Sequence, residues 1–323
     1  MTHKIAFLYE PEFVPPQIIR MAEERLAPGF ELTLVETESA NSSRRAAVGA
    51  ADFIIGYPAE LSPEELQSAA KLKLLQILSA GYEYLDLDSF RERHIPVANN
   101  GGANAPTVAE HAILLILAVF KKLPMHHNTL VDGVWLGAEE TLRMRELRGK
   151  ALGIVGFGRI GQEIARIAQG FQTVTIYNDL KAVSETLEEE TRATYAPLDT
   201  LLRQSDVVTI HTALTPQNHG LINASNLALM KSSAIVINTA RGPVIDEPAL
   251  IEALQNGTIA GAGLDVFVDE PLGKDSPLVS LPNVVLTPHT AGITLDTWAR
   301  RIEFGFSNIE RVAAGEPPQS VIS

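Results

Sequence analysis

Three ionisable residues in the second half of the chain have types that suit proton transfer beside a carbonyl group. Arg241, Glu270 and His289 each follow, directly or within a few residues, an apolar run that reads as a strand. Because ligands of open α/β sheets bind outside the carboxyl ends of strands, we expect the three to converge there. An imidazole is the usual proton donor near neutral pH, a carboxylate beside it fixes its tautomer, and a guanidinium grips a carboxylate through two parallel hydrogen bonds. Singly each is also read as an ordinary loop residue, but together they predict hydride transfer at a carbon bearing oxygen.

A glycine motif stands behind an apolar run and ahead of a helical pattern, which is the order that a dinucleotide-binding turn requires. Gly156 allows the tight reversal, Gly158 brings backbone N–H groups close to a pyrophosphate, and Gly161 lets the next helix pack on the sheet. The helix expected over 159–170 points its partial positive end at the phosphates. Asp179 ends the next strand, 18 residues after Gly161, where a carboxylate accepts both adenosine ribose hydroxyls. The motif predicts NAD as cofactor.

Strand and helix patterns alternate along the chain, which predicts an α/β protein with parallel, doubly wound sheets. The first hundred residues contain strand patterns at 5–9, 32–35, 53–55, 74–78 and 97–98, with helical patterns at 16–26, 63–70 and 87–93. The second series has strand patterns at 151–155, 174–177, 207–210, 234–237, 261–265 and 284–286, the six-strand count of a full dinucleotide fold. A nearly all-apolar helix at 105–121 and a long helix at 295–314 flank this series, and 126–148 is the least regular piece.

Composition narrows the partners and the compartment. A formal net charge of −13 disfavours nucleic acid and anionic membrane surfaces. The absence of cysteine excludes disulfides, thiolate catalysis and Cys-ligated metals, and the adjacent His126 and His127 do not share a helix face, so no metal is expected. The most apolar run, 112–120, is too short to span a bilayer, and the N-terminus lacks a signal-peptide core. We therefore expect a cytoplasmic protein.

The chain resembles the D-isomer-specific 2-hydroxyacid dehydrogenases over nearly its whole length. The matching stretches are 153–161, 238–246, 261–267 and 287–289, together with 108–111 at the opening of the family's interdomain helix. The resemblance implies that Arg241, Glu270 and His289 are the catalytic residues. Arg241 would orient the acid, and Glu270 would keep His289 charged until it donates its proton.

The resemblance also implies which residues bind the cofactor and the substrate. Asp265 would contact the nicotinamide carboxamide, and Thr107 would lie near the phosphates. The cofactor-binding set expected is Thr107, Gly156, Gly158, Arg159, Ile160, Gly161, Asp179, His211, Thr212, Ala240, Asp265 and Gly292. The backbone around Ser79, Ala80 and Gly81 would bind the substrate carboxylate, with Tyr57 and Pro58 forming a partly apolar wall.

The family architecture implies a discontinuous chain plan. A flavodoxin-like substrate domain of residues 1–102 and 291–323 would receive a Rossmann NAD-binding domain of residues 103–290. The expected protein is a homodimeric, NAD-dependent oxidoreductase acting on a small 2-keto or D-2-hydroxy acid, with glyoxylate or hydroxypyruvate favoured. Two alternatives stay open: an NAD(H)-sensing binding protein similar to the family's corepressors, and a reductase of a bulkier keto acid. Whether Arg300 or Arg301 enters the pocket is left open; either one, if it faced the cleft, would accept a second anionic group on the substrate.

Overall fold

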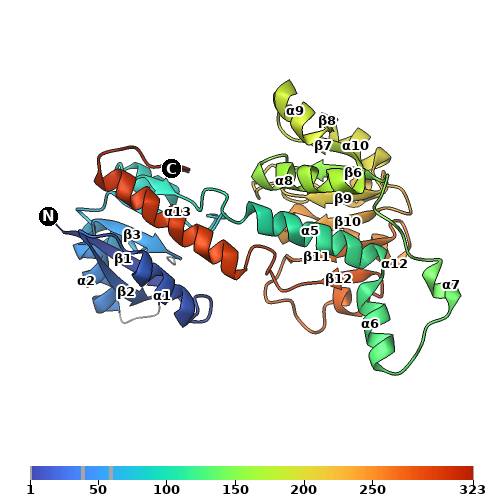
Figure 1. Ribbon diagram of the computed structural model, residues 1–323, viewed down its shortest axis with the longest axis horizontal. Helices are drawn as coiled ribbons and strands as arrows, with labels where there is room; N and C mark the ends of the chain where they lie inside the picture. The colour runs from blue at the N-terminus through green and yellow to red at the C-terminus, as the bar shows by residue number, and fades with distance from the viewer. Residues whose placement is uncertain (1, 38–40, 58–60, 323) are drawn as a thin grey trace. The chain divides into compact units, whose positions relative to one another are not determined.

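The computed structural model describes residues 2–37, 41–57 and 61–322 of the chain. The chain divides into two compact units, one formed by Met1–Asn104 with Ile293–Ser323 and the other by Ala105–Gly292 (Figure 1). The substrate and cofactor roles expected for the two domains stay predictions, and each unit is described by itself.

The first unit is a parallel sheet of five strands in the order β2-β1-β3-β4-β5. The strands are β1 (His3–Tyr9), β2 (Phe30–Glu36), β3 (Phe53–Gly56), β4 (Leu74–Ile77) and β5 (Val97–Ala98). The helices are α1 (Pro16–Arg25), α2 (Asn41–Ala50), α3 (Pro63–Ser68), α4 (Leu87–Arg91) and α13 (Leu295–Ala313). This order is the flavodoxin-like one, and its switch point lies between β1 and β3, where ligands of such sheets bind.

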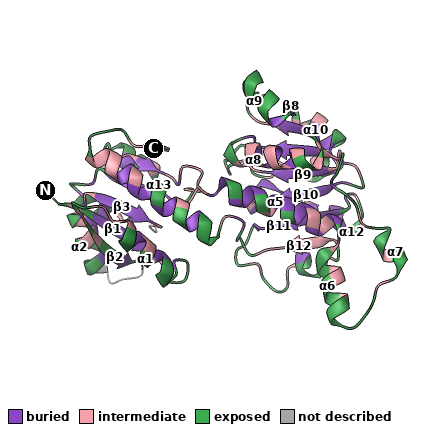
Figure 2. Ribbon diagram, in the orientation of Figure 1, coloured by how far each residue is buried: buried purple, intermediate pink, exposed green. Residues whose placement is uncertain are grey.

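The central strands of this sheet are buried (Figure 2). Apolar clusters pack on both of its faces, as in other parallel sheets. One cluster packs α1 and α13 against the strands and includes Ile18, Trp298 and Phe306. The other packs α2, α3 and α4 through Val48, Leu66 and Phe90. Each large side chain buried in this way contributes roughly 1.5–3 kcal/mol, so α13 is a structural part of the first unit despite its distance in sequence.

The second unit is a parallel sheet of seven strands in the order β12-β11-β10-β9-β6-β7-β8. The strands are β6 (Ala151–Val155), β7 (Val174–Asn178), β8 (Ala193–Tyr195), β9 (Val207–Ile210), β10 (Ile235–Asn238), β11 (Gly261–Leu264) and β12 (Val284–Leu286). Its α-helices are α5 (Ala105–Phe120), α6 (Leu123–Val131), α7 (Ala138–Thr141), α8 (Arg159–Ala168), α9 (Glu185–Thr191), α10 (Leu198–Gln204), α11 (Ala224–Leu227) and α12 (Glu247–Gln255). The order matches the doubly wound dinucleotide fold, with its switch point between β6 and β9. The predicted α/β fold class is therefore confirmed.

Helix α5 is buried against this sheet because glycines on β11 let it approach closely. A Cβ at Gly263 would lie 3.0 Å from Leu115 Cβ, and a Cβ at Gly261 would lie 3.1 Å from Val119 Cγ1. The two glycines face the helix at alternate strand positions, as a pleated strand requires. Within the described part of the chain, no helix is long and apolar enough to cross a membrane.

The count of six strands in the second unit was wrong, because β8 was missed. β8 has only three residues at the edge of the sheet, and Ala193 alone is buried. A segment this short shows no alternation that distinguishes it from a loop. In the dinucleotide fold, β8 corresponds to the third strand in chain order, at one edge of the sheet. β12 is the last strand at the opposite edge.

Three helices, α2, α6 and α7, were also missed where the buried stripe is weak. α2 has the sequence NSSRRAAVGA and packs closely on α3, since a Cβ at Gly49 would lie 3.2 Å from Ser68 Oγ. The segment 126–148 is not wholly irregular: α6 covers its first part and α7 a later one. Neither α6 nor α7 contains a buried residue, so the apolar period that reveals a helix is absent.

Candidate active site

The loops that follow the strands of the second unit carry most of the predicted cofactor and catalytic residues. Because the strands are parallel, their carboxyl ends lie at one edge of the sheet. The loops after the adjacent strands β10, β11 and β12 contain Arg241, Glu270 and His289 in turn. The sheet order therefore places these three loops side by side.

The glycine turn has the geometry that a bound pyrophosphate requires. Gly156 has φ of +92°, and a Cβ there would lie 2.7 Å from the backbone of His211, so only glycine fits. A Cβ at Gly161 would collide with the Gly156 carbonyl oxygen, which sets the close contact between turn and helix. By contrast, nothing lies within 4 Å of a Cβ built on Gly158, the N-cap of α8. The turn thus leaves open space at the helix N-terminus, where an anion binds.

Asp179 follows β7 and is joined to the glycine turn. Its Oδ2 accepts a hydrogen bond of 2.6 Å from the Phe157 backbone N–H, and its Oδ1 accepts one of 2.6 Å from Leu180 N–H. The Phe157 ring stacks on Tyr177 with 4.0 Å between ring centroids. These contacts fix the carboxylate beside the turn, in the position that suits ribose recognition.

His211 lies between the glycine turn and the loop after β10. Its Nε2 is 2.7 Å from Thr209 Oγ1, and its Nδ1 is 3.4 Å from Thr239 Oγ1. Burial lowers the pKa of His211 to about 3, so the ring is neutral at physiological pH. This histidine therefore supplies no titrating proton between pH 5 and 9.

Arg241 extends from a loop that Asn238 organises. The Asn238 side chain donates to the Arg241 carbonyl at 2.9 Å and accepts from Ala240 N–H at 3.0 Å. Arg241 Nη1 donates to the Ala240 carbonyl at 2.6 Å. A Cβ at Gly242 would collide with the Phe267 carbonyl, so this loop touches the one that carries Glu270.

Glu270 and His289 form a hydrogen-bonded pair. Glu270 Oε2 lies 2.6 Å from His289 Nδ1, and Glu270 Oε1 accepts from Phe267 N–H at 2.9 Å. His289 has φ of +51°, and its own N–H donates to the Asp265 carbonyl at 2.8 Å. The side chain of His289 is half exposed. Since Nδ1 is bound to the carboxylate, Nε2 is the ring nitrogen that can meet a ligand.

Asp265 is buried, and its carboxylate is already surrounded by donors. Its Oδ1 accepts from Thr287 Oγ1 at 2.6 Å and from Thr290 N–H at 2.9 Å, and its Oδ2 accepts from Ala291 N–H at 2.9 Å. The residue thus ties the end of β11 to the loop that contains His289. The cofactor contact expected of Asp265 stays a prediction.

The other residues expected at the cofactor lie in the same unit. Thr107 and Ala240 are buried, Ile160 packs partly against the core, and Thr212 and Gly292 are half-buried. Arg159 is exposed in the first turn of α8. Sequence reasoning missed Asn218, whose Oδ1 accepts from Thr215 N–H at 2.7 Å and whose Nδ2 donates to Thr212 Oγ1 at 3.2 Å, closing the loop after β9.

The substrate-loop residues expected from the sequence lie in the first unit. Tyr57 follows β3 at the switch point, and its hydroxyl accepts a 2.6 Å hydrogen bond from Arg301 Nη1. Arg301 is buried and lies over the Trp298 ring, 5.3 Å from its centroid. Burial lowers the pKa of Arg301 and raises the pKa of Tyr57. Arg301 is therefore held by contacts with Tyr57 and Trp298, while Arg300 Nε donates to the Ala103 carbonyl at 2.9 Å.

The loop after β4 has its shape fixed by its own polar groups. Ser79 Oγ donates to the Gly81 carbonyl at 2.7 Å, and Asn99 Nδ2 donates to the Ala80 carbonyl at 3.3 Å. Tyr84 Oη lies 3.3 Å from Ser79 Oγ. Pro58, the other expected wall residue, lies outside the described residues.

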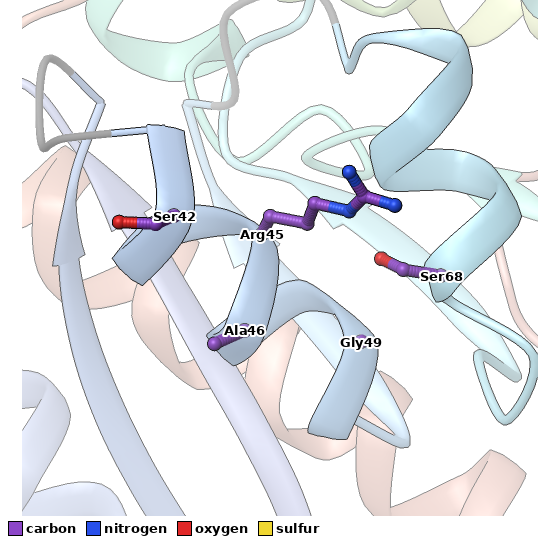
Figure 3. Close-up of a pocket in the computed structure, with 5 residues that line it drawn as sticks. All are labelled: Ser42, Arg45, Ala46, Gly49 and Ser68. Atoms are coloured by element: carbon purple, nitrogen blue, oxygen red, sulfur yellow. The ribbon is translucent and has the colours of Figure 1, made fainter.

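A hollow of about 620 Å³ lies between α2 and α3 in the first unit (Figure 3). Figure 3 shows Arg45 and Ser68 reaching into it from the two helices. The lining residues are Ser42, Arg45, Ala46, Gly49 and Ser68. None of them belongs to the predicted cofactor, catalytic or substrate sets, so this hollow is separate from the candidate site.

A doubly wound sheet with a glycine turn, a ribose-type carboxylate and a carboxylate–imidazole pair defines a nicotinamide-dependent oxidoreductase. Residues 113–291 match the family described as "D-isomer specific 2-hydroxyacid dehydrogenase, NAD binding domain". The chain is 34% identical to a glyoxylate reductase of Korarchaeum cryptofilum over 316 residues, 96% of this chain and 95% of that one. It is 36% identical to a glyoxylate/hydroxypyruvate reductase B of Pectobacterium carotovorum, over 90% and 91% of the two chains.

Solved structures agree with these sequence relatives. The crystal structure of D-lactate dehydrogenase with NAD+ from Lactobacillus jensenii has a TM-score of 0.84 at 27% identity and covers 99% of both chains. The chain belongs to the D-isomer specific 2-hydroxyacid dehydrogenase family. It is an NAD-dependent enzyme of that family, and the predicted enzyme class and cofactor are confirmed.

Proposed function

We propose that the enzyme reduces a small 2-keto acid to the D-2-hydroxy acid, with glyoxylate or hydroxypyruvate as substrate. The observation that carries this proposal is the 2.6 Å pair of His289 Nδ1 and Glu270 Oε2, in the loops next to that of Arg241. The relatives named for glyoxylate and hydroxypyruvate reduction support the substrate class.

The residues around the glycine turn fit NAD, because Gly158 leaves room for a phosphate and Asp179 presents a carboxylate where the ribose would lie. The bound cofactor supplies the hydride. Arg241 binds the substrate carboxylate through its planar guanidinium and polarises the neighbouring carbonyl. His289 donates a proton from Nε2 to the carbonyl oxygen, and Glu270 stabilises the imidazolium through Nδ1.

A panel of keto acids, assayed with NADH and NADPH separately, tests the proposal. We expect kcat/KM for glyoxylate or hydroxypyruvate to exceed that for phenylpyruvate and for phosphohydroxypyruvate. The described residues of the substrate loops, Tyr57 and 79–82, contain no lysine or arginine, and the Arg301 guanidinium is hydrogen-bonded to the Tyr57 hydroxyl. A phosphate in a dry pocket would need such a cation or several aimed N–H groups. Higher kcat/KM for phosphohydroxypyruvate than for both small acids would refute this substrate assignment.

The same panel decides between the proposal and its two alternatives. An NAD(H)-sensing binding protein would bind NADH but turn over none of the acids. A reductase of bulkier keto acids would prefer phenylpyruvate. The hydrogen-bonded His289–Glu270 pair favours turnover over sensing, because binding alone requires no proton donor.

Cofactor preference is expected to depend on the charge of Asp179. The wild-type enzyme should prefer NADH, because the Asp179 carboxylate repels a 2′-phosphate and Leu180 supplies no cation. Lys181 is the residue that would reduce this preference for NADH. Asp179→Asn keeps an oxygen for Phe157 N–H while removing the charge. We expect it to lower the NADH-to-NADPH ratio of kcat/KM about 10-fold to 100-fold, equivalent to about 1–3 kcal/mol. An unchanged ratio would show that Asp179 does not read the ribose.

Glu270→Gln is expected to lower kcat. Glutamine still accepts from Phe267 N–H, but it no longer carries the negative charge that stabilises the imidazolium of His289. Steady-state kinetics with glyoxylate measure this. A kcat within about 3-fold of wild type would separate Glu270 from His289 in function.

We also propose that the enzyme is a homodimer, with the segment around α6 at the interface. Val131, Val134 and Trp135 are exposed there, Trp135 to 87%, although Leu136 of the same segment is partly covered. Such a group of apolar side chains marks an interaction surface. Light scattering at micromolar concentration should give twice 35.0 kDa, and Trp135→Glu should lower that mass, whereas Phe13→Glu in the first unit should not. A wild-type mass of 35.0 kDa would contradict the dimer.

A further inference from the structure

A chain of hydrogen bonds links α5 to the loop that carries His289, through two side chains that have no assigned role. His111, in α5, places Nε2 3.0 Å from Thr287 Oγ1, and Thr287 Oγ1 donates to Asp265 Oδ1 at 2.6 Å. His111 Nε2 is also 3.6 Å from Asp265 Oδ1. The chain therefore runs from His111 through Thr287 to a buried carboxylate.

The direction of the bonds follows from the hydrogens available. Thr287 has one hydroxyl hydrogen, which it gives to Asp265, so the hydroxyl oxygen must accept from His111. His111 Nε2 therefore carries a hydrogen and is the donor that begins the chain. The His111 side chain is only 15% exposed and that of Asp265 is 1% exposed, so water competes little for these bonds.

The Asp265 carboxylate holds residues on both sides of His289 in place by accepting their hydrogen bonds. Thr287 precedes His289 by two residues, and Thr290 and Ala291 follow it; all three donate to the Asp265 carboxylate. The Asp265 carbonyl accepts from His289 N–H. His289 has φ of +51°, a conformation that a non-glycine residue keeps only when its surroundings hold it. The carboxylate and its donors are those surroundings.

We propose that His111 and Thr287 are positioning residues, which hold the imidazole of His289 in register for proton transfer by orienting Asp265. The proposal rests on the function proposed above for His289. Neither residue needs to touch the substrate, because a displacement of about 1 Å at the proton donor is enough to cost roughly 100-fold in rate. The effect should therefore fall on kcat rather than on NADH binding.

The test compares variants that keep or remove each hydrogen-bonding group in the full-length enzyme. Thr287→Val removes the hydroxyl at nearly constant shape, and Thr287→Ser restores it. His111→Leu removes the donor, and His111→Gln offers an amide N–H in its place. We expect about 10-fold to 100-fold lower kcat for the Val and Leu variants, and recovery to within about 3-fold of wild type for Ser and Gln. Glu110→Gln, at the exposed residue before His111, is the matched control and should leave kcat unchanged.

Two further readouts separate positioning from loss of stability. The kinetic isotope effect on kcat, with NADH deuterated at the transferred position, should rise in Thr287→Val as the chemical step becomes limiting. The double variant of Thr287→Val and His111→Leu should be no more than about 3-fold slower than the worse single variant, because residues of one chain are not additive. KM for NADH should stay within about 3-fold throughout.

Each other outcome overturns the proposal. These outcomes are kcat within 3-fold of wild type for His111→Leu, losses that multiply in the double variant, or an effect confined to KM for NADH. If Thr287→Val does not fold, the comparison of His111→Leu with His111→Gln tests the same proposal. His289→Asn separates a failure of the proposed function from a failure of the positioning role. Normal turnover in His289→Asn refutes the proposed function. An inactive His289→Asn together with a fully active His111→Leu refutes only the positioning role.

Discussion

His289→Asn is expected to lower kcat about 100-fold to 10,000-fold, the range that general acid catalysis contributes, or about 3–5 kcal/mol. Asparagine is the matched replacement because it tolerates the φ of +51° at this position, whereas alanine would add backbone strain. Its amide can still donate to Glu270, so the Glu270 carboxylate keeps a partner. It has no proton to release at neutral pH, and this alone should account for the loss.

The loss should appear in kcat and leave NADH binding nearly intact, since the glycine turn and Asp179 are untouched. Fluorescence titration with NADH measures the Kd, and steady-state kinetics with glyoxylate measure kcat and KM. His94→Asn, at an exposed histidine of the first unit with a φ of +55°, is the control for a general effect of losing a histidine. A kcat within 3-fold of wild type would remove His289 from the reaction.

The glycine turn could be predicted from the sequence because the local backbone geometry requires glycine at particular positions. Gly156 is required by a φ of +92° and by the nearby His211 backbone, and Gly161 by the close packing of turn and helix. The strand before and the helix after the turn are also continuous in sequence. Short elements with few buried residues gave no such signal, which is why β8 and α6 were missed.

The composition of the candidate site could be predicted because parallel strands bring their carboxyl ends to one edge. Arg241, Glu270 and His289 follow adjacent strands, and the Glu270–His289 pairing expected from the family is present at 2.6 Å. Their roles in the reaction remain predictions. The strand plan alone, however, does not specify which backbone groups hold the side chains in place.

The supporting contacts could not be predicted because they join residues far apart in sequence. His111 and Thr287 are 176 positions apart, and Tyr57 and Arg301 are 244 apart. No periodicity relates such pairs, and a buried arginine on a helix reads from the sequence as a surface charge. The sequence left open whether Arg300 or Arg301 faces the substrate, and it does not reveal the hydrogen bond that Arg301 donates to Tyr57 in the first unit.

Substitution of Arg241 is expected to have the second large effect on activity, because hydrogen bonds within the protein already hold its guanidinium in place. Nη1 donates to the Ala240 carbonyl, and Asn238 fixes the Arg241 main chain, so the fork is held in one orientation. A pre-oriented guanidinium loses little freedom when it binds a carboxylate. Two charge-assisted hydrogen bonds to the substrate should together contribute about 2–4 kcal/mol.

Arg241→Met is therefore expected to lower kcat/KM for glyoxylate about 30-fold to 1,000-fold, with Arg241→Lys intermediate because it keeps the charge without the fork. KM for NADH should not change. The methyl ester of the same keto acid supplies the internal control: it has no carboxylate for Arg241 to grip, so its kcat/KM should fall much less in Arg241→Met than that of the acid. Steady-state kinetics with the acid and the ester on wild type and both variants measure the difference. Equal losses for acid and ester would mean that Arg241 supports the loop after β10 rather than the substrate carboxylate.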